Sequence, residues 1–103
     1  MEHGLSIEDI AIIKKVFWAH SNIYEVILFG SRAKGNYKPG SDIDLAVVAD
    51  AFTFDELLEL HTELEKLGLL YRFDIQNFKK IKDPCVIDHI ERVGKVFYNR
   101  GKL

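Results

Sequence analysis

Two aspartates, Asp42 and Asp44, stand one residue apart at the start of an apolar segment of the chain. Residues i and i+2 of a strand point to the same face, so these two carboxylates would lie close together. Negative charges at that spacing repel each other, and a hard cation bound between them would offset the repulsion. Because Mg²⁺ prefers oxygen ligands and keeps room for water and phosphate oxygens, the pair predicts a magnesium site. The alternative is a solvated strand start.

A third aspartate, Asp74, lies in the segment 71–76, whose alternating residues predict another strand. Asp74 falls on the more polar face of that strand, at the point that matches the aspartate pair. Two metal ions a few ångströms apart can hold an attacking and a leaving oxygen in line. Asp74 is therefore the natural third ligand, next to the metal that would activate an attacking hydroxyl.

Gly30 and Ser31 follow the β-rich segment 24–29 and begin a loop that leads to the aspartates. Gly30 allows the backbone to approach a ligand closely, and Ser31 begins a short helical turn that can hold phosphate oxygens. Arg32 and Lys34 would add positive charge, although both could be ordinary surface residues. Phosphate-binding residues beside paired carboxylates describe a site for a metal–nucleoside triphosphate complex.

Other common sites do not fit the sequence. Gly30 and Gly35 have the spacing of a Walker A loop, but Asn36 and Tyr37 stand where that motif requires Lys and Ser or Thr. The single cysteine, Cys85, excludes an internal disulfide framework and a Cys-rich zinc site. The four histidines have no mutual spacing that indicates a metal site.

The composition predicts one small domain, spanning residues 1–103. Apolar residues make up 48% of the 103 residues and charged residues 29%, with a net charge of −2 and a pI of about 6.1. Binding of duplex nucleic acid is not expected, because such domains carry a basic stripe. No apolar run approaches the roughly 20 residues of a membrane-spanning helix, and no signal peptide is visible, so we expect a cytoplasmic protein.

The periodicity of apolar residues and the cap signals define the expected elements. Helices are predicted at 7–20, 54–67 and 84–93, a helical turn at 31–34, strands at 24–29, 42–48 and 71–76, and a short edge strand at 95–98. The order is α-β-α-β-α-β-α. Because the first two strands are joined by a loop with one helical turn, we expect an α+β fold. It would contain a small mixed β-sheet with helices packed mainly on one face.

Gly30-Ser31, ten intervening residues and Asp42-Ile43-Asp44 resemble the signature of the DNA-polymerase-β-like nucleotidyltransferase superfamily. Asp74 matches the third carboxylate of that superfamily. The length of the chain and the amino-acid sequence of residues 30–47 are similar to those of its minimal nucleotidyltransferase (MNT) family. The resemblance implies the nucleotidyltransferase fold, two Mg²⁺ ions, and ATP as the substrate from which AMP passes to a hydroxyl.

The resemblance also implies a partner. Proteins of the minimal family pair with small helical proteins of the HEPN type, often as the antitoxin of a toxin–antitoxin pair, and the hydroxyl is then a tyrosine of the toxin. Two other functions stay open: a non-catalytic module that neutralises its partner by occlusion, and a small-molecule nucleotidyltransferase whose acceptor site a partner supplies. The sequence does not decide between a homodimer and a hetero-oligomer.

Overall fold

A computed structural model describes residues 2–102 of the chain and confirms the predicted order of elements. The helices are α1 (Ile7–Trp18), α2 (Gly30–Lys34), α3 (Phe54–Glu65) and α4 (Pro84–Val93), with 3₁₀ turns η1 (Phe78–Lys80) and η2 (Arg100–Lys102). The strands are β1 (Ile23–Phe29), β2 (Ile43–Ala49), β3 (Phe73–Asn77) and β4 (Lys95–Asn99). None of the helices described has the length and apolar character needed to cross a membrane.

The three longer helices begin at the capping residues that the sequence predicts. The side chains of Ser6, Thr53 and Asp83 accept hydrogen bonds from backbone N–H groups in the first turns of α1, α3 and α4, at 3.1, 3.1 and 2.9 Å. Each cap satisfies one of the N–H groups that a helix start leaves unpaired. Pro84 follows its cap at the first helical position, where a missing N–H costs nothing.

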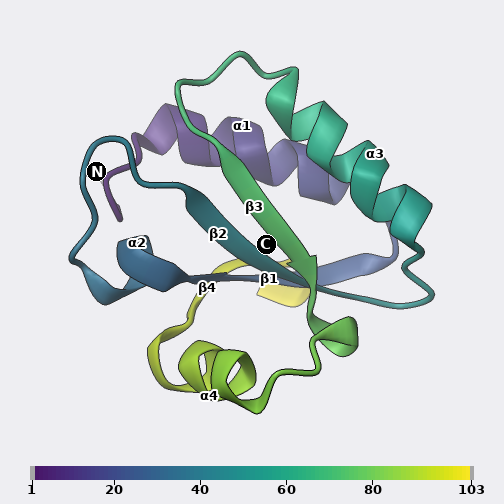
Figure 1. The fold of residues 1–103 in the computed structure, drawn as a ribbon. Helices are drawn as coiled ribbons and strands as arrows, with labels where there is room; N and C mark the ends of the chain where they lie inside the picture. The colour runs from purple at the N-terminus through teal and green to yellow at the C-terminus, as the bar shows by residue number, and fades with distance from the viewer. Residues whose placement is uncertain (1, 103) are drawn as a thin grey trace.

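The four strands form one mixed sheet in the order β3-β2-β1-β4 (Figure 1). β1 pairs antiparallel with both β2 and β4, whereas β2 and β3 are parallel and are joined through α3. The predicted mixed sheet is thus confirmed, and β4 is the edge strand expected near residues 95–98. Most boundaries differ from the prediction by one or two residues, and two of these differences touch the aspartates: Asp42 lies just before β2, and β3 runs from Phe73 to Asn77.

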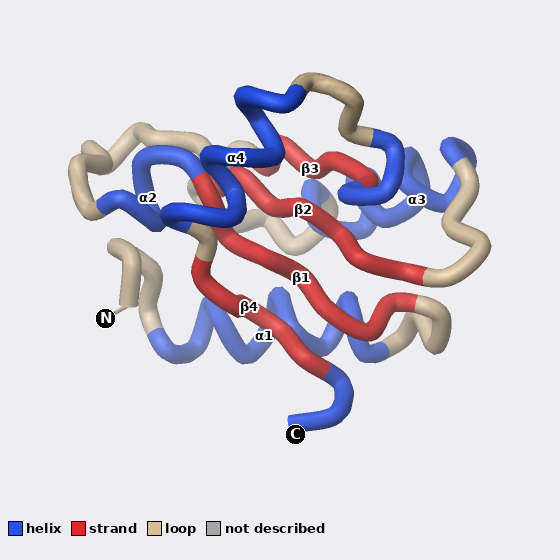
Figure 2. The backbone as a smooth tube through the Cα atoms, turned by 90° about the horizontal axis from the view of Figure 1, so that it is seen from below, coloured by secondary structure: helices blue, strands red, loops and turns tan. Residues whose placement is uncertain are grey.

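The two longest helices, α1 and α3, cover one face of the sheet, as expected, and α4 lies on the opposite face (Figures 1 and 2). Alternation along the strands supplies both layers. Val26 and Leu28 of β1 belong to the larger core beneath α1 and α3, while Phe29 packs in a smaller cluster with Ile90 of α4. The smaller cluster also contains Ala46 of β2, so even-numbered residues of β2 face α4.

Candidate functional site

Asp44 and Asp74 are direct neighbours on adjacent strands. Residues 43–47 of β2 pair in register with residues 73–77 of β3, and Asp44 is the partner of Asp74. Parallel strands lie about 4.8 Å apart, so the two carboxylates share one region of the sheet surface. Asp44 precedes Ala46 by two residues, which sets both aspartates on the face that α4 partly covers.

Gly30 brings the backbone of the chain against the Asp44 carboxylate. It follows the last residue of β1, begins α2, and has a φ of +73°. A Cβ atom at this position would collide with the carboxylate oxygen of Asp44. Only glycine therefore satisfies both the left-handed backbone conformation and the close approach.

The environment of Asp44 disfavours its charged form. Burial of the carboxyl, the negative charges of Asp74 and Asp42, and a side-chain hydrogen bond with Asp74 raise the pKa of Asp44 from 3.8 to about 6. The positive charge of Arg32 acts in the opposite direction but only in part. Negative charge is thus concentrated at this point of the sheet, which is the condition that favours binding of a cation.

The oxygen donors of this site fit Mg²⁺ in their chemistry. Asp42 is exposed, and its carboxylate lies 3.7 Å from the guanidinium of Arg72 across the start of the two strands. Within residues 2–102, no three His, Cys, Asp or Glu side chains converge tightly enough to form a metal cage. Mg²⁺ commonly binds through one or two carboxylates and takes its other ligands from water and substrate phosphates. The paired carboxylates of Asp44 and Asp74 suit that mode, and Asp42 adds its negative charge nearby.

Ser31 and Lys34 lie on α2, the helix that begins at Gly30. Ser31 is partly buried in the first turn of this helix, and its carbonyl accepts the N–H of Gly35. Lys34 is exposed at the last residue of the helix. Binding of nucleotide phosphates by Gly30, Ser31 and Lys34 remains a prediction.

Arg32 has a different role from the predicted phosphate contact. Its side chain is 1% exposed, and its guanidinium donates hydrogen bonds to the carbonyls of His3 and Ser41 at 2.9–3.2 Å. The rings of Tyr37 and Tyr71 lie 5.3 and 5.2 Å from the guanidinium carbon. These contacts hold the guanidinium inside the molecule, so Arg32 fastens the loop between α2 and β2 and reaches Asp44 only through its charge.

We expect Arg32→Lys to destabilise the folded domain by about 2–3 kcal/mol, because an ammonium cannot reproduce the planar hydrogen bonds and ring contacts. Urea unfolding measures the change. Arg92→Lys is the matched control, since Arg92 forms an exposed ion pair with Asp88, and a loss within about 0.5 kcal/mol is expected there. Equal effects of the two substitutions would contradict the structural role of Arg32.

His89 is a site residue that the sequence did not reveal. Its Nε2 accepts a hydrogen bond from the N–H of Gly30 at 3.1 Å, and its ring meets Phe29 edge-on at 6.2 Å. His89 also lines a cavity of about 380 Å³ together with Gly30, Asp44 and Gln76. The two bonded residues lie 59 positions apart, so no local spacing in the sequence links them.

We expect His89→Phe to weaken nucleotide binding about fivefold, because Gly30 loses the acceptor that orients its N–H beside Asp44. Titration with a fluorescent ATP analogue measures this change. His89→Gln, which keeps an acceptor, serves as the control and should retain most of the affinity. If the phenylalanine variant binds the analogue like the unmodified protein, the hydrogen bond does not position the site.

Three relatives are similar to this chain in sequence. MJ1379 of Methanocaldococcus jannaschii is 39% identical over 82 residues, which is 76% of this chain and 80% of that protein. MntA of Haemophilus influenzae is 32% identical over 94 residues, 87% of this chain and 76% of that protein. MJ0604 of M. jannaschii is 48% identical over 42 residues, 41% of either chain. The names of all three designate protein adenylyltransferases.

Solved structures and a family model agree on the fold. A crystal structure described as a toxin–antitoxin with AMP-PNP has a TM-score of 0.71 at 22% identity, covering 92% of this chain and 74% of that one. A tri-AMPylated Shewanella oneidensis HEPN toxin in complex with its MNT antitoxin gives 0.68 at 20%, covering 89% and 71%. The family model "Polymerase beta, Nucleotidyltransferase" matches residues 11–103. With most of its length matched by this model, the chain belongs to the polymerase-β-type nucleotidyltransferase family.

Proposed function

We propose that this chain, as one minimal nucleotidyltransferase domain of residues 1–103, transfers AMP from ATP to a tyrosine hydroxyl of a HEPN-type partner in a Mg²⁺-dependent reaction. It would act in the cytoplasm, where ATP is available, as the antitoxin of a toxin–antitoxin pair. The observation that carries the proposal is the pairing of Asp44 with Asp74 beside the Gly30 turn. The names of the relatives and the AMP-PNP complex among the structural neighbours support the nucleotide and the protein acceptor.

The residues of the site have separate tasks in this reaction. Asp42, Asp44 and Asp74 would hold Mg²⁺, which supplies charge neutralisation of the triphosphate. Gly30 and Ser31 would hold the phosphates. Asp74 would orient the acceptor hydroxyl and take its proton. The hydroxyl oxygen then forms a bond to the α-phosphorus, the bond from this phosphorus to the bridging oxygen breaks, and pyrophosphate leaves with that electron pair.

Labelling with α-³²P ATP and Mg²⁺ tests the proposal. The purified chain is incubated with a lysate of its own host, and the Asp44→Asn variant is the control. A labelled protein band that appears only with the unmodified chain establishes nucleotidyl transfer and delivers the acceptor for identification by mass spectrometry.

Two other results would change the conclusion. If no band is labelled and Mg²⁺–ATP binding is also undetectable, the chain neutralises its partner by occlusion, without catalysis. A labelled small molecule in place of a protein band would identify a small-molecule nucleotidyltransferase. Gel filtration of the chain alone and with the labelled acceptor separates a homodimer from a hetero-oligomer.

A further inference from the structure

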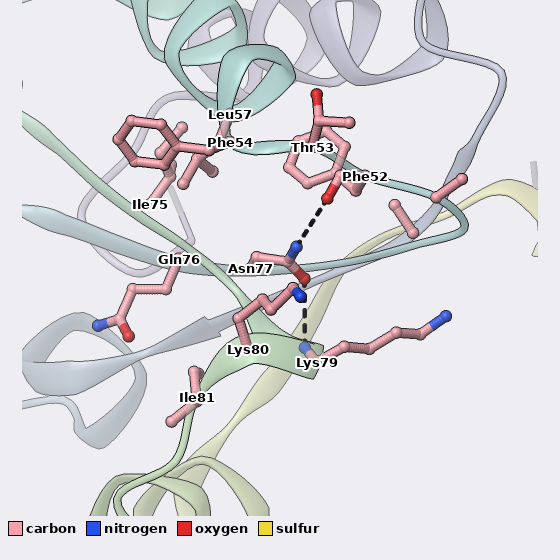
Figure 3. A pocket seen from close by; sticks show the side chains of 12 residues that line it. Phe52, Thr53, Phe54, Leu57, Ile75, Gln76, Asn77, Lys79, Lys80 and Ile81 are labelled. Carbon is pink, nitrogen blue, oxygen red and sulfur yellow. Dashed lines mark hydrogen bonds between the residues drawn. The ribbon is translucent and has the colours of Figure 1, made fainter.

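A second, larger cavity lies where β3 ends and α3 begins, with a volume of about 930 Å³ (Figure 3). We call it the β3 groove. Its apolar lining includes Phe52, Phe54, Leu57, Ile75 and Ile81. Gln76 lines both this groove and the smaller cavity that contains Asp44. The groove and the cavity beside Asp44 therefore adjoin at Gln76 of β3.

β3 is an edge strand, and its outer side faces this groove. The N–H of Ile43 in β2 donates to the carbonyl of Arg72 at 2.8 Å. The Arg72 carbonyl therefore points toward β2. Because the N–H and C=O groups of successive strand residues point to opposite sides, those of Phe73, Ile75 and Asn77 point to the outer edge. Nε2 of His61 lies 3.1 Å from the Phe73 carbonyl and covers that position. The edge that remains lies at Ile75 and Asn77, both of which line the groove.

The walls of the β3 groove are held in position by the Asn77 side chain. Its amide donates to the carbonyl of Phe52 at 3.1 Å, and its oxygen accepts the N–H of Lys79 at 3.2 Å, as the dashed lines in Figure 3 show. These two bonds join the end of β3 to the start of α3 and to η1. Asn77 thus links the segments that form the walls of the groove.

The rim of the β3 groove combines apolar and positive side chains. Phe54 is 70% exposed, and Leu58, one helical turn further along α3, is 50% exposed. On the opposite rim, Lys79 pairs with Asp50 at 3.3 Å, whereas Lys80 forms no ion pair within residues 2–102. A segment that fits this rim carries apolar side chains and has acidic residues near them.

We propose that the β3 groove binds an extended segment of the acceptor protein, which adds to the sheet at the edge of β3. The proposal rests on the proposed function, because it assigns the docking site of that reaction's acceptor. Side chains of an added strand alternate between the two faces. A hydroxyl residue on the face of Asp74 therefore has its two chain neighbours on the face of α3, near Phe54 and Leu57. The structure assigns an acceptor sequence in which apolar residues flank the hydroxyl residue and acidic residues follow.

Peptide binding tests this assignment without any nucleotide or transfer. ¹⁵N-labelled protein is titrated with the peptide Glu-Glu-Ile-Tyr-Ile-Glu-Glu and, separately, with a copy in which both isoleucines are serine. We expect saturable shifts of the Ile75 and Asn77 amides with the first peptide. We expect about tenfold weaker binding of the serine copy, which loses two buried side chains. A copy with N-methylated backbone amides, which cannot pair with a strand, should not bind.

Protein variants supply the matched comparison. Phe54→Ser should weaken binding of the isoleucine peptide about tenfold, because it removes the exposed ring at the rim. Ile7→Ser, at a position on α1 that is 72% exposed, should leave the affinity unchanged. Equal binding of the isoleucine and serine peptides, or no shift at Ile75, overturns the proposal. A Phe54→Ser variant that loses affinity for AMP-PNP instead would identify the nucleobase as the occupant. Because no transfer is measured, these outcomes are independent of whether labelling with ATP succeeds.

Discussion

Replacing Asp44 by asparagine should abolish nucleotidyl transfer and, at the same time, make the folded domain more stable. Asp44 lies between the Gly30 turn and Asp74, so it is the central member of the predicted metal-binding set. An amide is a poor ligand for Mg²⁺ and carries no charge to hold it. We expect the rate of AMP transfer to fall by about 10³-fold or more, as measured with α-labelled ATP and the identified acceptor.

The gain in stability has an electrostatic cause. Burial and two neighbouring carboxylates raise the pKa of Asp44 to about 6, which means that its negative charge destabilises the fold at neutral pH. A rise from 3.8 to about 6 corresponds to at most about 3 kcal/mol, and solvent screening of this partly exposed group reduces it to about 1 kcal/mol. The variant, without Mg²⁺, should therefore melt about 5 °C higher than the unmodified chain.

The pH dependence distinguishes this cause from a gain in packing. The pKa of Asp44 is higher in the folded protein than in the unfolded chain, so the folded state takes up the proton first as the pH falls. As the pH falls from 6 to 4, protonation of Asp44 makes the unmodified protein more stable, whereas the asparagine variant has no such group and gains nothing from it. The difference in melting temperature should be largest near pH 7.5 and vanish near pH 4.

Asp88→Asn is the control for the Asp44 substitution, because Asp88 is exposed and forms an ion pair with Arg92 on α4. It should give neither a gain in stability nor a loss of transfer. An active Asp44→Asn protein would remove this residue from the reaction. If the Asp44→Asn variant is inactive but its stability equals that of the unmodified protein at every pH, Asp44 still takes part in transfer, and the electrostatic explanation of the stability gain is wrong.

Local signals explain why most elements of this fold could be predicted. Ser6, Thr53 and Asp83 cap their helices through bonds to residues two or three positions away, a distance that sequence patterns cover. Asp44 and Asp74 each alternate with apolar residues along their strands, and this pattern predicted that each lies on the more polar face of its strand. Their direct pairing then follows from a parallel register that aligns the apolar residues of both strands.

Long-range contacts explain what the sequence could not predict. An arginine in a loop rich in glycine and lysine is typical of a surface residue, and the burial of Arg32 depends on Tyr37, Tyr71 and the carbonyl of His3. His89 reaches Gly30 only because α4 returns across the face that carries the carboxylates. Neither the contacts of Arg32 nor the hydrogen bond between His89 and Gly30 produces a periodicity or a fixed spacing that could be recognised in the sequence.

Gly30→Ala should eliminate transfer almost as completely as the loss of a metal ligand, although it adds only a methyl group. The added Cβ would collide with the Asp44 carboxylate, and the backbone there has a φ of +73°. We expect a fall in transfer of about 100-fold. We also expect a loss of about 2–3 kcal/mol in the free energy of unfolding, from collision and backbone strain together.

Gly35→Ala separates the two causes. Gly35 ends α2 with a φ of +91°, and a Cβ there would have no neighbour within 4 Å, so this variant carries the strain without the collision. It should lose about 1 kcal/mol in the free energy of unfolding and keep its activity.

A double-mutant cycle completes the test. In an Asp44→Ala background, the nearest atom of position 44 to the new methyl group is the Cβ, at 3.3 Å, and the collision is relieved. In that background, Gly30→Ala should lower the free energy of unfolding by no more than Gly35→Ala does. If it lowers the free energy of unfolding as much as it does in the unmodified protein, Gly30 is needed for its backbone conformation alone.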